Sequence, residues 1–121
     1  MAIINPTVNR TPQGANSVFT AQWALGNADT GVAVTMTDFS DKSIQIEGTF
    51  GGATVTIQGS NDGVNWETLR DPGSVALTFT SAGLKQVLEM TYYLRAITAG
   101  GSGTAVTVTL CGRALSPKSW S

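Results

Sequence analysis

The sequence contains no histidine among its 121 residues and only one cysteine, Cys111. Without histidine the chain has no Ser-His-Asp or Cys-His arrangement for nucleophilic catalysis and no zinc site with a histidine ligand. A single cysteine excludes an intramolecular disulfide bond, so the fold does not depend on an oxidising compartment. Cys111 lies at the end of a predicted strand with no base to activate its thiol, and we interpret it as a small packing residue.

Charged residues are also scarce, at 12% of the chain, and seven basic against eight acidic side chains leave a net charge of −1. The basic residues are scattered, so the sequence offers no patch of the kind that binds nucleic acid. No apolar run approaches the roughly 18 residues of a membrane-spanning helix. The first residues resemble no signal peptide, so we expect synthesis in the cytoplasm. We also expect no membrane partner and no cofactor.

Carboxylates are the remaining candidates for catalysis. Glu47, Glu67 and Glu89 lie on predicted strands, but nothing in their spacing places two of them across a cleft. We therefore interpret all three as solvent-facing strand residues, and we expect that the protein is not an enzyme.

Acidic and amide side chains in two loops suggest a calcium site as an alternative to a purely structural role. Asp38 and Asp41 share one loop, and Asn61, Asp62 and Asn65 surround a turn. Such residues supply oxygen ligands to calcium, but they also stabilise turns and tolerate the left-handed conformation. The turn interpretation is favoured, because the sequence contains no D-x-D-x-D-G series, and we expect no metal site.

Glycine and β-branched residues are abundant, and the segment 43–69 (SIQIEGTFGGATVTIQGSNDGVNWETL) shows how they are arranged. Polar and apolar residues alternate in its parts 43–50 and 53–59, which predicts two strands. Gly51-Gly52 between them predicts a two-residue hairpin turn with positive φ. In that hairpin Ile46 would lie opposite Ile57.

Turn signals separate further short strands along the chain. Asn61-Asp62-Gly63 predicts a second hairpin, and Asp71-Pro72-Gly73-Ser74 predicts a type II turn. Beyond the two strands above, we predict strands at 18–25, 32–37, 76–80, 84–90, 92–98 and 104–111. Eight or nine short strands with minimal helix indicate an all-β fold, an antiparallel β-sandwich or jelly-roll-like domain.

We predict three regions: an extended N-terminal arm at 1–17, a β-sandwich domain at 18–111 and a C-terminal tail at 112–121. The arm either packs onto the chain's own core or inserts into a partner, and the sequence favours neither. For the C-terminal tail, an indole between serines favours insertion into a neighbour. The predicted partner-binding residues are Ile3, Ile4, Pro6, Val8 and Arg10 in the arm and Leu115, Pro117 and Trp120 in the tail.

The other two tryptophans, Trp23 and Trp66, lie in strand patterns, where packing in the core or at its rim is the simplest interpretation. Trp66 is able to cover Gly59 across the second predicted hairpin. An aromatic platform on which a sugar stacks is the alternative for these two residues.

Two parts of the chain resemble structural proteins of tailed bacteriophages. One is IQGSNDGVNWETLRD at 57–71 with the following ALTFT at 76–80, and the other is TYYLRAITAGGSGTAVTVTL at 91–110. The resemblance implies a capsid cement, or decoration, protein: a small β-sandwich on the outer surface of the virion, bound to the major capsid protein where its subunits meet. A homo-oligomer is also expected, with a trimer first and a dimer next.

A second resemblance supports a different class of function. SNDGVNWETL at 60–69 is similar to the S-x-D-G-x-x-W hairpin of discoidin-type carbohydrate-binding modules, which are jelly rolls. This chain is shorter and lacks the pair of terminal cysteines that many of those modules carry. A glycan-binding module is therefore the second hypothesis, and a phage protein associated with the tail or fibres is the third.

Overall fold

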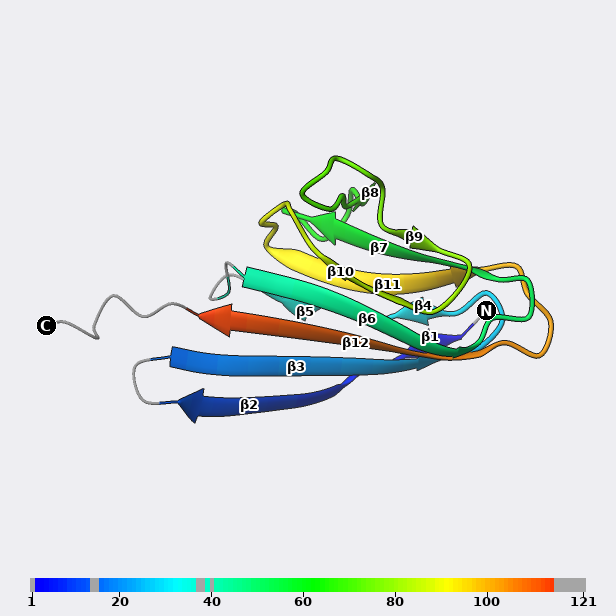
Figure 1. The fold of residues 1–121 in the computed structure, drawn as a ribbon, viewed down its shortest axis with the longest axis horizontal. Coiled ribbons are helices and arrows are strands. Elements are labelled where there is room, and N and C mark those ends of the chain that lie inside the picture. Colours follow the sequence, from blue (N-terminus) through cyan, green and yellow to red (C-terminus); the bar gives the residue numbers. More distant parts are fainter. Residues whose placement is uncertain (1, 14–15, 37–38, 40, 115–121) are drawn as a thin grey trace, which may run out of the picture.

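The computed structural model describes residues 2–13, 16–36, 39 and 41–114, which form two β-sheets packed face to face (Figure 1). The all-β sandwich class predicted from the sequence is confirmed. No helix occurs in these ranges, and consequently none that is long and apolar enough to cross a membrane.

The first sheet, sheet A, has the strand order β1-β4-β11-β7-β8, with β5 also paired to β11 and β9 to β7. Its strands are β1 (Ile3–Ile4), β4 (Thr30–Gly31), β5 (Val34–Thr35), β7 (Thr54–Ser60), β8 (Glu67–Thr68), β9 (Thr78–Phe79) and β11 (Tyr93–Ala99). All its pairs are antiparallel except β1 with β4, so the prediction of a fully antiparallel sandwich needs this one correction.

The second sheet, sheet B, has the order β10-β6-β12-β3-β2, and every pair in it is antiparallel. Its strands are β2 (Thr7–Gln13), β3 (Asn16–Leu25), β6 (Asp41–Thr49), β10 (Gly83–Gln86) and β12 (Ala105–Ala114). Figure 1 shows β2 as the outermost strand of this sheet.

The core lies between the sheets, because alternate residues of each strand point inward as the sequence period of two requires. Trp23 is fully buried there, and its Nε1 donates a 2.9 Å hydrogen bond to the carbonyl oxygen of Val32. A Cβ atom at Gly31 would lie 2.7 Å from the Trp23 ring, so position 31 has room only for glycine. The largest fully buried side chains are Trp23, Leu25, Ile44, Ile46, Val55, Ile57, Leu77, Leu94, Val106, Val108 and Leu110.

The predicted hairpin between the segments 43–50 and 53–59 is wrong in its pairing. Gly51 and Gly52 do form a turn, with φ of 59° and 85°, and the Ala53 N–H donates to the Phe50 carbonyl oxygen at 2.9 Å. The turn joins β6 of sheet B to β7 of sheet A, however, so Ile46 lies opposite Val108. Alternation defines which side chains face the core, and both possible pairings satisfy it equally.

The first residues of the chain are incorporated into both sheets. β1 pairs with β4 at one edge of sheet A, and β2 pairs with β3 at one edge of sheet B. Most of the described part of the predicted arm is therefore strand that pairs with its own chain, and the last strand, β12, continues past the predicted limit to Ala114. The described residues form twelve strands where eight or nine were expected, because two-residue strands and an edge strand carry too little alternation to detect.

The Asp71-Pro72-Gly73-Ser74 turn also differs from its predicted type. The Ser74 N–H donates to the Asp71 carbonyl oxygen at 2.8 Å, as in any hydrogen-bonded turn. The left-handed residue is Ser74, with φ of 65°, whereas a type II turn requires that conformation one residue earlier, at Gly73.

Gly52→Val should lower the free energy of unfolding by about 1–2 kcal/mol, because a β-branched residue strongly disfavours positive φ. A Cβ atom at this position meets nothing within 4 Å, so backbone conformation alone causes the loss. Urea denaturation measures it, with Gly52→Asn as the control that tolerates positive φ and should lose less. Equal losses in the two variants would contradict the assignment of the turn.

Candidate interaction surfaces

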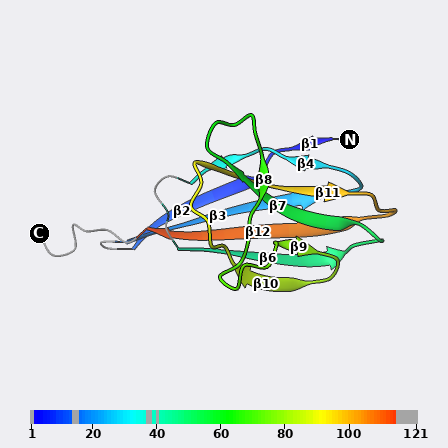
Figure 2. The same cartoon turned by 90° about the horizontal axis from the view of Figure 1, so that it is seen from above.

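The predicted residues of the N-terminal segment lie in β1 of sheet A, in β2 of sheet B and in the link between these strands. Ile3 in β1 is 63% exposed and Val8 in β2 is 48% exposed, while Ile4 packs partly against the core. Pro6 joins the two strands, and Arg10 lies in β2 opposite Phe19. Figure 2 shows the chain leaving β1, which runs beside β4, and continuing into β2.

The tail residues Leu115, Pro117 and Trp120, proposed from the sequence as partner contacts, lie outside the described residues. Asp38, one of the possible calcium ligands, lies outside them as well. Their roles stay predictions.

β2 has an open edge that leaves backbone groups available for pairing. It is seven residues long and, within the described part of the chain, pairs only with β3. The other edge strands among the described residues are shorter: β10 has four residues, and β1, β5, β8 and β9 have two each. A long open edge is a template for pairing with another strand, so β2 is the edge best suited to association.

A second surface lies on sheet A, where an arginine stacks on a tryptophan. The Arg95 Cζ atom lies 4.0 Å from the ring centroid of Trp66, and the Arg95 Nε donates a 2.9 Å hydrogen bond to the Gln58 Oε1. We call Gln58, Trp66 and Arg95 the stack. All three are partly buried, and this burial lowers the pKa of the Arg95 guanidinium from its usual value. At neutral pH the guanidinium nevertheless stays charged.

Sequence reasoning did not find the stack. It paired Trp66 with Gly59, but a Cβ atom at Gly59 would meet Thr91 and Leu69 at 2.6–2.7 Å, so these two residues fill that space. The pairing of β7 with β11, which brings Gln58 opposite Arg95, joins residues far apart in sequence, and no local pattern signals it.

The loop before Trp66 is held by the Asp62 carboxylate. Its Oδ1 accepts hydrogen bonds from the backbone N–H groups of Asn65 and Val64, both at 2.8 Å, and its Oδ2 accepts one from the Asn65 Nδ2. These donors hold the pKa of Asp62 far below its usual value. In addition, the Asn61 Oδ1 accepts a hydrogen bond from the Tyr92 N–H at 3.0 Å. The arrangement agrees with the turn-stabilising interpretation of these residues.

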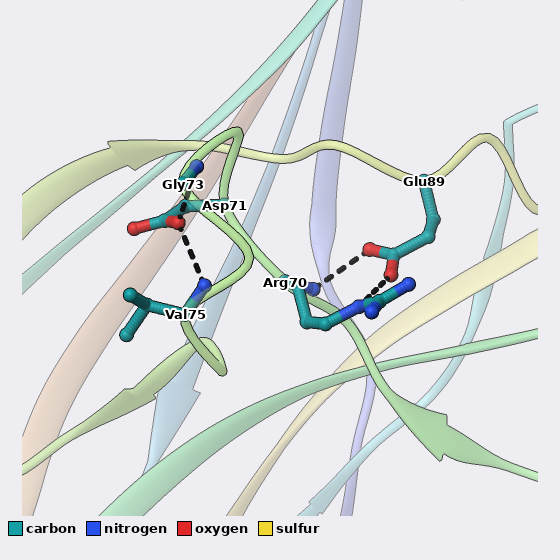
Figure 3. A network of polar contacts seen from close by, with 5 residues as sticks. All are labelled: Arg70, Asp71, Gly73, Val75 and Glu89. Atoms are coloured by element: carbon teal, nitrogen blue, oxygen red, sulfur yellow. Dashed lines mark hydrogen bonds and ion pairs between the residues drawn. The ribbon is translucent and has the colours of Figure 1, made fainter.

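Glu89 is held by Arg70, as Figure 3 shows. The Arg70 backbone N–H donates to Glu89 Oε1 at 2.7 Å, and the Arg70 Nε donates to Oε2 at 2.5 Å. Partial burial raises the pKa of Glu89, but these hydrogen bonds outweigh the burial and leave that pKa below its usual value. The pair fastens the segment after β10 to the loop after β8.

Asp71 organises the neighbouring turn in the same figure. Its Oδ1 accepts from the Gly73 N–H at 2.9 Å and the Val75 N–H at 3.0 Å, and its Oδ2 lies 3.6 Å from the Lys85 Nζ. The hydrogen bond from Val75 is the main cause that lowers the pKa of Asp71.

The three glutamates considered for catalysis do not form one group. Glu47 is exposed on β6 of sheet B. Glu67 and Glu89 line one open depression of about 390 Å³, together with Asp62. Within the described ranges, no three acidic, cysteine or histidine side chains are close enough to hold a metal ion together.

Two further groups lie at sheet B. Cys111 is partly exposed and lies opposite Ser43 of β6, on the outer face of the sheet. Lys42 is only 2% exposed, and its Nζ donates a 3.4 Å hydrogen bond to the Phe39 carbonyl oxygen. Burial lowers the pKa of Lys42, and the neighbouring Asp41 partly offsets that effect. The sequence does not predict the burial of Lys42, because a lysine is expected to point to solvent.

No protein family and no curated protein matches the sequence. Among solved structures, the SPBc2 prophage-derived protein YomS is similar with a TM-score of 0.62 and 10% identity, over 94% of this chain and 97% of that one. A cupin domain from Bordetella pertussis Tohama I gives a TM-score of 0.46 and 11% identity, over 93% and 97%. The likeness to YomS shows a shared fold, and the cupin likeness is too low to carry an argument.

Glu89→Gln should destabilise the protein by about 0.5–1 kcal/mol at pH 7, the range of a partly exposed ion pair. Because the pKa of Glu89 is lowered on folding, its contribution is complete well above the unfolded value of 4.5 and is lost as the pH falls through the folded value.

Urea unfolding of the parent and the variant at neutral and strongly acidic pH measures this dependence. The difference between the two proteins should vanish in acid, and Glu47→Gln is the control with an exposed carboxylate. A difference that is the same at both pH values would contradict the role of the Arg70–Glu89 pair.

Proposed function

We propose that this chain is a bacteriophage structural protein, a capsid cement protein that binds the outer surface of the shell where major capsid protein subunits meet. It acts by adhesion and carries out no reaction. Three features support the proposal: the fold, the rigidity of the sandwich and the open edge of β2.

The fold supports the phage assignment. YomS is prophage-derived and matches almost the whole length of this chain, and the segments 57–71 and 91–110 resemble phage structural proteins. We infer jelly-roll-like connectivity as well, since consecutive strands such as β6 and β7 lie in opposite sheets.

Rigidity suits a protein that transmits force between subunits. At the end of the sandwich near the N-terminus, the Asp29 carboxylate accepts hydrogen bonds from the backbone N–H groups of Gly26 at 2.7 Å and Ala2 at 3.2 Å. The Thr98 hydroxyl accepts from the Asp29 N–H and donates to the Gly26 carbonyl oxygen, both at 2.7 Å. The start of the chain is thereby fixed to the loops it adjoins.

The single observation that carries the proposal is the open edge of β2, on which Val8 is 48% exposed; Ile3 is exposed on the other edge strand of this segment, β1. Apolar side chains next to unpaired backbone groups stabilise association, both by burial and by hydrogen bonding. We propose that the protein is a homo-oligomer, a trimer or a dimer. If β2 pairs edge to edge with β2 of a second copy, the result is a dimer, because antiparallel pairing of identical strands has two-fold symmetry.

Binding at subunit junctions would stabilise the shell by mass action. A ligand that binds only the assembled state stabilises it by about 2.7 kcal/mol per site at a hundredfold excess over Kd. Many such sites on one shell add up to a large resistance to disassembly, which is how a small inert domain strengthens a virion.

Glycan binding is the second candidate, and the observation that favours it is the partly exposed Trp66 on sheet A. An indole that stacks on a sugar offers a free face, whereas Arg95 lies over the Trp66 ring at 4.0 Å. A glycan array that gives clear hits would favour this candidate over the capsid.

The proposal predicts that the purified protein co-sediments with capsids of the phage that encodes it and saturates at a fixed ratio to the major capsid protein. Saturation is expected because junctions between subunits are equivalent and finite in number. Capsids of an unrelated phage are the control. Absence of co-sedimentation at any protein concentration would contradict the cement function.

Replacing both Ile3 and Val8 by lysine should weaken self-association by about tenfold or more, because charges on an edge strand oppose pairing and apolar burial is lost. Sedimentation-velocity analysis over a range of concentrations measures the change. Val64→Lys is the matched control, since Val64 is 77% exposed in the loop between β7 and β8. An unchanged association constant, or a parent protein that is monomeric throughout, would contradict the role of these two edge strands.

A further inference from the structure

The stack lies on the outer face of sheet A, away from the open edge of sheet B. Along β7 the buried Val55 and Ile57 alternate with partly exposed residues, and Gln58 belongs to the exposed set. Along β11 the buried Leu94 and Ala96 alternate in the same way with a set that includes Arg95. Gln58 and Arg95 are direct neighbours across the two strands, so both point away from the core.

The charge of Arg95 has no carboxylate partner among the described residues. The ion pairs there join Arg70 to Glu89 and Lys85 to Asp71, and Arg95 takes part in neither. Its one hydrogen bond goes from Nε to the neutral amide oxygen of Gln58. A guanidinium has five N–H donors in one plane, so the group keeps most of its capacity to bind an anion.

The position of this guanidinium is fixed before any partner arrives. Trp66 supports its face at 4.0 Å, and Gln58 fixes its rotation about the Nε bond. The loop that carries Trp66 is held by the Asp62 turn, and a Cβ atom at Gly63 would lie only 3.3 Å from the Tyr93 ring. Such preorganisation lowers the entropy cost of binding, and tryptophan and arginine are enriched at the energetic centres of protein interfaces.

We propose that the stack on sheet A binds a carboxylate side chain, Asp or Glu, of a protein partner. The planar carboxylate accepts hydrogen bonds from the terminal nitrogen atoms of Arg95. The indole of Trp66 meanwhile stacks against the face of the Arg95 guanidinium and holds it in place. We take the partner to be a protein and not a sugar acid, because the guanidinium already lies over one face of the indole on which a sugar ring would stack. This inference rests on the proposed function only in taking the partner to be a protein.

The test is an NMR titration of the full ¹⁵N-labelled chain that follows the Trp66 Nε1–H and Arg95 Nε–H resonances. The probes are Ac-Ala-Glu-Ala-NH₂ and its neutral counterpart Ac-Ala-Gln-Ala-NH₂. We expect saturable shifts of both resonances with the glutamate peptide and affinity at least about fivefold lower for the glutamine peptide, since only the first offers a charge-assisted pair. Equal affinity for the two peptides, or no shift with either, would overturn the proposal.

Variants assign the effect to this site. Arg95→Gln should abolish the shift of the Trp66 indole, whereas Arg113→Gln, which removes an exposed arginine on sheet B, should leave it unchanged. Arg95→Lys keeps the charge but loses the planar fork, so it should also bind more weakly, and it provides the test if the glutamine variant does not fold. Full binding by either Arg95 variant would overturn the proposal.

A third probe separates the two sources of carboxylate. Sodium glucuronate should bind more weakly than the glutamate peptide, and tighter binding would overturn the protein partner in favour of an acidic glycan. The results of the capsid experiment and of the peptide titration can be told apart. If the protein binds the glutamate peptide but does not co-sediment with capsids, the cement function alone is contradicted. Intact co-sedimentation with no peptide binding counts against the stack alone.

Discussion

Burial of one common apolar core between the two sheets is the interaction on which the rest of this structure depends. Trp23 sits in that core with its indole nitrogen bonded to the Val32 carbonyl oxygen, and Gly31 lets the backbone approach the ring. The alternate residues of each strand, which point away from this core, are then free to form the outer surfaces of the sandwich. The loops at the two ends are held by side-chain oxygens such as those of Asp29 and Asp62, so the block presents fixed surfaces.

Much of this architecture was predictable, because strand formation and side-chain facing are local properties. Alternation correctly placed Ile44, Ile46, Val55 and Ile57 in the core, and the positive φ of Gly51 and Gly52 follows from their sequence. Pairing partners were not predictable: the turn at these glycines joins different sheets. The sequence 43–60 satisfies the same alternation in a hairpin or in a sheet-to-sheet connection, and only long-range contacts distinguish them.

The candidate surfaces, too, could be predicted only where they depend on local sequence and not on strand pairing. Ile3 and Val8 were predicted to be adhesive because apolar residues in a polar segment stand out, and they are exposed. The sequence did not predict that they lie in edge strands, because such strands show little alternation of polar and apolar residues. The stack of Arg95 on Trp66 was missed because it depends on the pairing of β7 with β11 and on the loop that positions the indole. The two surfaces lie on different sheets, so the proposed contact with a second copy and the proposed contact with a partner would not compete for one site.

If this domain attaches to a protein shell, as we propose, a cryo-electron microscopy reconstruction of the phage particle that encodes the chain should show it in place. We expect density of the size and shape of this sandwich on the outer surface of the capsid, at the junctions between subunits. A complete particle whose capsid surface lacks such density, or that carries the protein only in its tail, would contradict it.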